Sequence, residues 1–378
     1  MTNYHFKDNL DDTSYQDISK SIVKNPFRRL NNKEEFSIPN RILCQSIHIN
    51  NFNGSAKKMV GSEKSSYSCH SLESAKGEIE KLLSLGIEKV FIQLLPINES
   101  DSINKKIDDF TKILLLLRQE FKDDLTILVD PQGVCMRSDL RWGVSGPRGE
   151  IDAEETLNVL AKTALEFGKS GINGFVNLGR LNFESKIVKS VFDKNSLPVK
   201  VMSFSTNSET ANAYIQETSL NPKSAVTGQK ILVGNASEMV LRALMDIEEG
   251  VDIVIQKPIE NFHILQYLQL ILKGKISPEE FLQDRCFTSF SEYQFLEKRL
   301  PRLAQNLSDK LNQVSLGAYE VSGTYSIFKM LEDKVPLALV FTLLDELYKN
   351  AFSAGGDLFN LLIGRNVSWY VAAKKEFT

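Results

Sequence analysis

The stretch ASEMVLRALMDIEEGVDIVIQKPI, residues 236–259, joins the pattern of an amphipathic helix directly to that of a buried strand. Residues 236–250 place apolar side chains at helical spacing and end at a glycine, a common helix terminator. Residues 251–257 form an almost continuous apolar run, which is typical of a parallel strand covered on both faces. The run ends in Lys257 and Pro258. The lysine is therefore either a surface residue at a strand end or a nucleophile.

The same alternation of strand and helix patterns repeats along the chain. Helical patterns cover 71–86, 107–121 and 153–171. The strand candidates are residues 41–49, 89–96, 125–130, 172–178, 199–205, 230–234, 251–257 and 314–322. This repetition predicts a (β/α)8 TIM barrel. An open doubly wound sheet is the alternative, and the lack of a Gly-rich phosphate loop after the first strand disfavours it.

Two segments depart from the barrel pattern. Residues 1–40 begin with many Asp, Asn and Ser residues, so we expect an N-terminal extended arm that is partly disordered. Residues 271–313 are longer than one helix needs, so we expect an insertion before the last strand, serving as a lid or a subunit contact. The barrel domain itself is expected over 41–378.

The bulk composition excludes several classes of partner. The 378 residues carry a net charge of -3 and no dense basic tract, which disfavours binding to nucleic acid or to a membrane surface. The longest apolar run, 113–117, is too short to span a bilayer. The N-terminus lacks the pattern of a signal peptide, so we expect a cytoplasmic protein. The 4 cysteines are scattered without CxxC spacing, which favours reduced thiols over disulfides or a zinc knuckle.

Five motifs, in order, resemble those of the porphobilinogen synthases, also called delta-aminolevulinic acid dehydratases. They are NPFRRL (25–30), VMSFSTN (201–207), EEGVDIVIQKP (248–258), GAYEVSGTYSIFK (317–329) and AGGDLFNLL (354–362). The resemblance covers about residues 25–371. It implies an enzyme that condenses two 5-aminolevulinate molecules into a pyrrole, with a Schiff-base lysine for each. It also implies a homo-oligomer in which the arm contacts a neighbouring subunit.

The resemblance implies that the first substrate site is largely kept. Lys257 matches the family's principal Schiff-base lysine, and burial of a lysine amine favours its neutral, nucleophilic form. Ser322 matches a serine that binds the substrate carboxylate, and Tyr319 matches a tyrosine of the same pocket. The family's other carboxylate partner is a tyrosine whose position falls on Leu362, so half of this clamp is missing.

The second substrate site departs from the family pattern. Its lysine position is Asn207, and an amide cannot form an imine. No arginine lies between Asn207 and Gln229 to hold a second carboxylate. Lys230 aligns approximately with a lid glutamine of the family and is a candidate anion ligand.

The metal site of the family's zinc-dependent members is not kept either. Its three cysteine positions fall on Gln132, Val134 and Trp142, none of which suits a thiolate-binding metal. We therefore expect no metal and no cofactor, although Asp139 or Asp152 leaves a weak hard-cation site open.

Three functions remain after this comparison. The first is a Schiff-base enzyme that acts through Lys257 on a small keto or aminoketo acid. The second is a non-catalytic binding or assembly paralogue. The third is a functional porphobilinogen synthase with a rearranged second site, which the missing lysine and arginines make chemically difficult.

Overall fold

The computed structural model describes residues 37–50, 54–58, 68–96, 100–137, 142–209, 231–232, 234–282, 293–307 and 309–377. The chain divides into two compact units, Met1–Ile38 and Pro39–Thr378. Most of the first unit, and with it residues 1–36 of the predicted arm, lies outside the described residues. The fold described below is that of the second unit.

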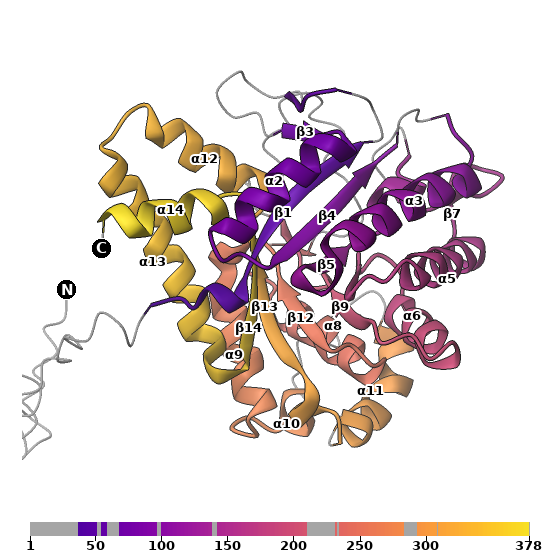
Figure 1. The fold of residues 1–378 in the computed structure, drawn as a ribbon. Helices are drawn as coiled ribbons and strands as arrows, with labels where there is room; N and C mark the ends of the chain where they lie inside the picture. The colour runs from indigo at the N-terminus through magenta and orange to yellow at the C-terminus, as the bar shows by residue number, and fades with distance from the viewer. Residues whose placement is uncertain are drawn as a thin grey trace, which may run out of the picture. The chain divides into compact units, whose positions relative to one another are not determined.

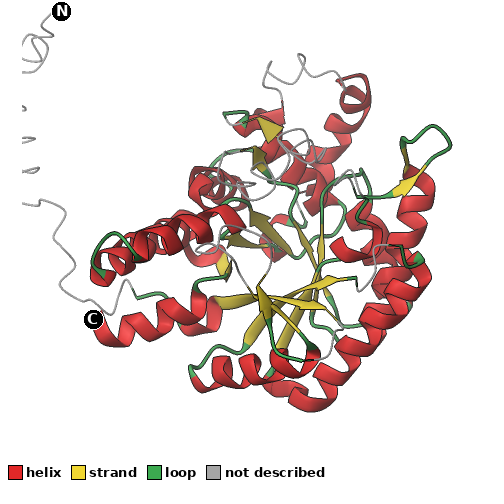
Figure 2. Cartoon of the chain, turned by 90° about the horizontal axis from the view of Figure 1, so that it is seen from above, coloured by secondary structure: helices red, strands yellow, loops and turns green. Residues whose placement is uncertain are grey.

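Eight parallel strands close into a barrel (Figures 1 and 2). The closing pair joins the first strand to the last, with Leu43 opposite Leu362. In chain order, the strands are β1 (Leu43–Asn50), β4 (Lys89–Leu95), β5 (Thr126–Val129), β8 (Gly174–Asn177), β9 (Lys200–Ser203), β12 (Ile253–Gln256), β13 (Ser315–Tyr319) and β14 (Phe359–Gly364). This arrangement confirms the predicted TIM barrel.

Helices surround the barrel as an outer layer (Figure 2). Side-chain caps set where several of them begin: the Ser71 hydroxyl accepts from the Ser74 N–H, and the Asp152 carboxylate accepts from the Glu155 N–H. The main helices are α2 (Leu72–Ser84), α3 (Ile103–Phe121), α5 (Ala153–Lys169), α6 (Glu184–Lys194), α8 (Ala236–Glu248), α9 (Phe262–Leu272), α12 (Ser322–Glu332), α13 (Leu337–Gly355) and α14 (Val367–Phe377). The helices predicted at 71–86, 107–121, 153–171 and 236–250 are thus confirmed.

The interior of the barrel is a packed core. Three aromatic rings meet there: Phe204 stacks on Tyr319 with ring centroids 5.4 Å apart, and Phe91 packs edge-on against both. All three side chains are buried. The carboxyl ends of the strands surround this aromatic layer. A side chain that directly follows a strand can therefore contact the face of the layer at that end of the barrel.

One predicted strand is not part of the barrel. The segment 230–234 contributes β11 (Ile231–Leu232), which among the described residues pairs with β10 (Ser208–Glu209) in a separate two-stranded sheet. The eighth barrel strand is instead β14, which was not predicted. A short apolar run does not distinguish a barrel strand from another extended segment, so the spacing of elements was misread.

The position of the predicted insertion changes accordingly. Residues 271–313 precede β13, the seventh barrel strand, rather than the last strand, because β14 closes the barrel. Their described helices, α10 (Pro278–Leu282) and α11 (Tyr293–Leu307), pack on each other, and α11 also packs on α8 in the outer layer. In Figure 1 they lie at the opposite end from the arrowheads of β1 and β4. These helices therefore do not form a lid, and a subunit contact stays a prediction.

Within the described residues, none of the helices combines the length and the apolar character that crossing a membrane requires.

Candidate active site

Lys257 follows β12 directly and lies at the carboxyl end of the barrel. Its N–H donates to the Thr206 carbonyl at 2.9 Å, and its own carbonyl accepts from the Ser208 N–H at 2.9 Å. These bonds extend the pairing of β9 with β12 beyond the strands. The Lys257 Nζ lies 4.9 Å from the Phe204 ring centroid and 5.8 Å from that of Tyr319. The amine therefore rests on the aromatic layer at the mouth of the barrel, the end at which TIM-barrel active sites form.

Asp130 is a buried carboxylate in the same region. It follows β5, and its Oδ1 accepts from the Gln132 N–H at 3.0 Å. Burial raises the pKa of Asp130 to about 6, against the opposing effects of the Gln132 N–H and the positive charge of Lys257. A carboxyl group with this pKa, within electrostatic reach of an amine, can exchange protons near neutral pH.

A second cation lies at the same mouth. Arg365 comes directly after β14, and its Nη2 donates to Gln93 Oε1 at 3.2 Å. The Tyr319 hydroxyl donates to the same Gln93 oxygen at 3.3 Å. The ring of His48, from β1, lies 2.9 Å from Arg365 Nη1 through its Nδ1. Burial, with the charge of Arg365 as a second cause, holds the pKa of His48 well below its usual value.

The structure brings together several of the residues predicted from the sequence. Asn207 forms a bridge with Lys257 through the main chain and is fully buried, and Tyr319 lies beside the lysine amine. Ser322 is the first residue of α12, three positions after Tyr319, which puts it at the same end of the barrel. Lys230 lies outside the described residues.

The three positions of the family's metal ligands have structural roles here. Val134 is fully buried, and Trp142 is buried with its Nε1 donating to the Pro131 carbonyl at 3.2 Å. Gln132 Oε1 accepts from Gln93 Nε2 at 3.5 Å. Among the side chains that the structure describes, no group of three or more His, Cys, Asp and Glu is arranged to hold a metal ion. Asp139 lies outside the described residues, and the carboxylate of Asp152 caps α5.

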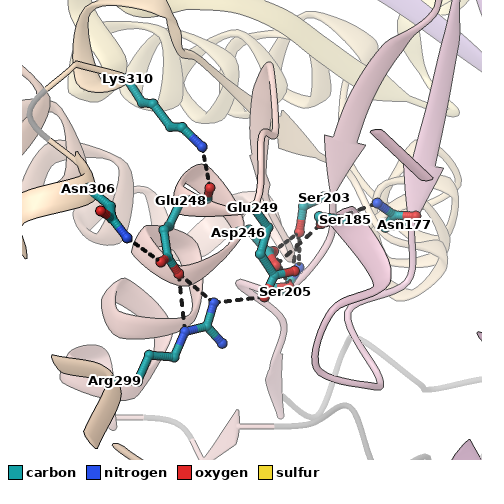
Figure 3. Close-up of polar contacts among 10 residues, drawn as sticks. All are labelled: Asn177, Ser185, Ser203, Ser205, Asp246, Glu248, Glu249, Arg299, Asn306 and Lys310. Carbon is teal, nitrogen blue, oxygen red and sulfur yellow. Dashed lines mark hydrogen bonds and ion pairs between the residues drawn. The ribbon is translucent and has the colours of Figure 1, made fainter. Parts of the chain in front are cut away.

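A buried polar network joins α8 to the end of β9 (Figure 3). Asp246, on α8, accepts hydrogen bonds from the hydroxyls of Ser203 and Ser205. Burial raises the pKa of Asp246 to about 6, although the two serine hydroxyls oppose this shift. Ser203 and Ser205 flank Phe204, so the network fixes the strand end that carries the lysine's aromatic support.

Sequence reasoning did not assign a role at the site to Asp130, Gln93, His48 or Arg365. Asp130 had a usable signal, because it ends the apolar run of residues 125–129 just as Lys257 ends its own. His48 and Gln93 had a weaker signal, as polar residues inside apolar runs. Arg365 had none, because the strand before it was not predicted.

The closed parallel barrel, with its surrounding layer of helices, defines the chain as a TIM-barrel protein. The chain belongs to the delta-aminolevulinic acid dehydratase family, whose model matches residues 19–275.

One curated relative and one solved structure accompany this assignment. The chain is 23% identical over 194 residues to the delta-aminolevulinic acid dehydratase of Bacillus subtilis (strain 168), a match that covers 50% of this chain and only 60% of that protein. The fold is similar to that of delta-aminolevulinic acid dehydratase (porphobilinogen synthase) from Toxoplasma gondii ME49, solved in complex with the reaction product porphobilinogen. That similarity has a TM-score of 0.67 at 16% identity and covers 95% of this chain and 94% of the other. At this identity, it establishes the fold.

Proposed function

We propose that the protein is a Schiff-base enzyme that acts through Lys257 on a small keto or aminoketo acid similar to 5-aminolevulinate. The observation that carries this proposal is the position of the Lys257 amine, held over the rings of Phe204 and Tyr319 at the carboxyl end of the barrel. An amine in that position meets a carbonyl compound entering the mouth. Family membership supports the same class of chemistry.

The reaction begins with attack of the Lys257 nitrogen on the carbonyl carbon. The resulting carbinolamine loses its oxygen as water, which leaves a carbon–nitrogen double bond to the lysine. The departing oxygen needs a proton, and Asp130, whose pKa is raised to about 6, is the candidate proton donor. The imine or its enamine then eliminates water or forms a new bond with a partner molecule.

The environment of Asn207 favours one carbonyl substrate over two. Asn207 is fully buried and is bridged to Lys257, so the family's second lysine position lies beside the first but carries no amine. A pyrrole synthesis that needs two imines therefore lacks one of its nucleophiles. The two alternatives, a working porphobilinogen synthase and a non-catalytic paralogue, are decided by the following measurement.

Intact-protein mass spectrometry after borohydride reduction tests the proposal. Purified protein is incubated with 5-aminolevulinate and with a panel of small keto acids, then reduced. We expect one adduct per chain, heavier by the ligand minus one oxygen atom, and its loss in Lys257→Ala. The matched control is Lys200→Ala, an exposed lysine at the start of β9, which keeps the adduct.

Each other result selects a different function. Formation of a pyrrole from 5-aminolevulinate alone identifies a working synthase. Failure of every carbonyl compound to form an adduct contradicts the enzyme proposal and leaves the binding paralogue. An adduct that survives in Lys257→Ala assigns the chemistry to another amine.

A further inference from the structure

Gln93 is a buried amide on β4 that hydrogen-bonds to two groups of residues at the candidate site. Its Oε1 accepts from the Tyr319 hydroxyl at 3.3 Å and from Arg365 Nη2 at 3.2 Å. Its Nε2 donates to Asp130 Oδ2 at 3.3 Å. This one side chain therefore joins the aromatic layer that contacts the Lys257 amine to the candidate proton donor.

The neighbours of the Gln93 amide favour one of its two orientations. An arginine side chain donates hydrogen bonds and accepts none, so Arg365 requires an oxygen opposite it. A reversed amide would set the Gln93 N–H groups against those of Arg365 and its oxygen against an oxygen of Asp130. Both hydrogen bonds would then become repulsive contacts, which is costly for buried polar groups. The N–H group of Gln93 is therefore directed at Asp130.

The two oxygens of Asp130 are held by donors from different parts of the chain. Oδ2 accepts from the Gln93 side chain, and Oδ1 accepts from the main-chain N–H of Gln132 at 3.0 Å. Two such donors fix the plane of the carboxyl group, whereas the Gln132 N–H alone would let it turn. Each oxygen has further lone pairs, so the group can still carry a proton. The charges of Lys257 and of Arg180, which comes after β8, both act on this carboxyl group and favour its ionised form.

We infer that Gln93 is a positioning residue, which fixes the Asp130 carboxyl group for proton transfer to the carbinolamine on Lys257. This inference rests on the proposed function. In that step, the Asp130 proton passes to the carbinolamine oxygen, and the carbon–oxygen bond breaks with its electron pair leaving in the water molecule. The lone pair of the Lys257 nitrogen forms the carbon–nitrogen double bond, which gives a protonated imine. Asp130 is left as a carboxylate, and the Gln93 N–H stabilises its new charge.

The test is a double-mutant cycle on the rate of imine formation between the protein and levulinate, a small keto acid. Borohydride trapping at successive times, followed by intact-protein mass spectrometry, gives that rate. Gln93→Met keeps the length of the side chain but removes its donors, and we expect it to lower the rate by about 10- to 100-fold. In the Asp130→Asn background, Gln93→Met should have no further effect, because the group that Gln93 positions can no longer give a proton.

Two further variants complete the cycle. Gln119→Met makes the same change at an exposed position of α3 and should react at the wild-type rate. Gln93→Asn keeps an amide on a shorter side chain and serves if Gln93→Met does not fold. Its rate should lie between those of the wild type and Gln93→Met, and its effect should also vanish in the Asp130→Asn background.

The other outcomes overturn separate claims. A wild-type rate in Gln93→Met, or an equal slowing in both backgrounds, refutes the positioning role. If the wild type forms no adduct with any carbonyl compound, the proposed Schiff-base function fails.

Urea unfolding at pH 4.5 and pH 7.5 then still decides whether Gln93 holds Asp130. Burial raises the pKa of Asp130, and the Gln93 hydrogen bond opposes this rise by stabilising the charged form. Gln93→Met should therefore lose more stability at pH 7.5, where that form is present, than at pH 4.5. Equal losses at the two pH values would refute the contact.

Discussion

A β-carbon on Gly364 would lie 2.5 Å from Oε2 of Glu320. The glycine thus leaves room for a buried carboxylate that accepts from the N–H groups of Arg365 and Asn366 and from the Tyr348 hydroxyl. Glu320 thereby holds the main chain that carries Arg365. The end of β14 is thus fixed by a side chain that directly follows β13.

Gly364→Ala is expected to displace Glu320 and to shift Arg365 without touching Lys257. Overpacking of this kind costs about 1–3 kcal/mol of unfolding free energy. Urea unfolding measures that loss. Gly77→Ala is the control: it lies in α2 with open space around it, so we expect a gain of about 1 kcal/mol. A Gly364→Ala protein with wild-type stability would contradict this account.

Asp130 is expected to make stability depend on pH. Its pKa is raised from 3.8 to about 6 in the fold, so its protonated form stabilises the fold fully below pH 4, and that stability is lost as the pH rises through 6. The shift corresponds to on the order of 3 kcal/mol. The stability of Asp130→Asn relative to the wild type should therefore be greater at pH 7.5 than at pH 4.5. Urea unfolding at the two pH values measures this difference. The exposed Asp124→Asn variant is the matched control for the loss of one carboxylate. A gain in stability for Asp130→Asn that does not depend on pH would count against the prediction.

Ser205→Ala should weaken the support of β9 in a manner that depends on pH. The serine hydroxyl donates to Asp246, and a hydrogen bond to a charged group contributes about 1.5–3 kcal/mol. Burial raises the pKa of Asp246 to about 6, so the carboxylate is charged at pH 8 and mostly protonated at pH 5. Unfolding measurements should show the larger loss at pH 8. The control is Ser145→Ala, at an exposed position of β6 (Val144–Ser145), whose stability should not differ between the two pH values in this way. Equal losses of unfolding free energy at pH 5 and pH 8 for Ser205→Ala would refute the prediction.

Arg299→Ala should weaken the attachment of α11 to α8. Arg299 Nη2 pairs with Glu248 at 2.7 Å and with Glu249 at 2.8 Å (Figure 3), and the Glu249 side chain is only 4% exposed. Removal of the cation deprives the buried carboxylate of Glu249 of this ion pair, which costs about 3 kcal/mol of unfolding free energy. Faster hydrogen exchange in α11 would accompany the loss of unfolding free energy. Arg302→Ala on the same helix is the control, and a variant of Arg299 as stable as that control would show that the pair contributes little.

The barrel could be predicted wherever a strand carried its own signal. Residues 89–96 and 251–257 are mostly apolar without strict alternation, a pattern typical of a parallel strand that is covered on both faces. Strand β14 did not stand out as a separate apolar run, because Asn360 interrupts its sequence and the apolar helix α13 precedes it. The segment 230–234 had the right composition, but a strand joins a barrel through its pairing, which its own sequence does not record.

The residues of the candidate site also differ in whether the sequence alone carries a signal for them. Lys257 could be singled out because it ends an apolar run and also matches the principal Schiff-base lysine of the family motif. The cluster around Arg365 could not, because its contacts join residues more than 270 positions apart, such as Arg365 and Gln93. Their proximity exists only once the barrel is closed.

The pairing of β1 with β14 has a consequence for protein synthesis. A ribosome makes β1 first among the barrel strands and β14 last, yet the two must meet edge to edge. Until β14 has emerged, the nascent sheet presents two unpaired edges, β1 and β13, which are templates for pairing with other chains. The growing polypeptide therefore cannot close its barrel until almost the whole chain has been made, and its edge strands stay open to pairing with other chains until then.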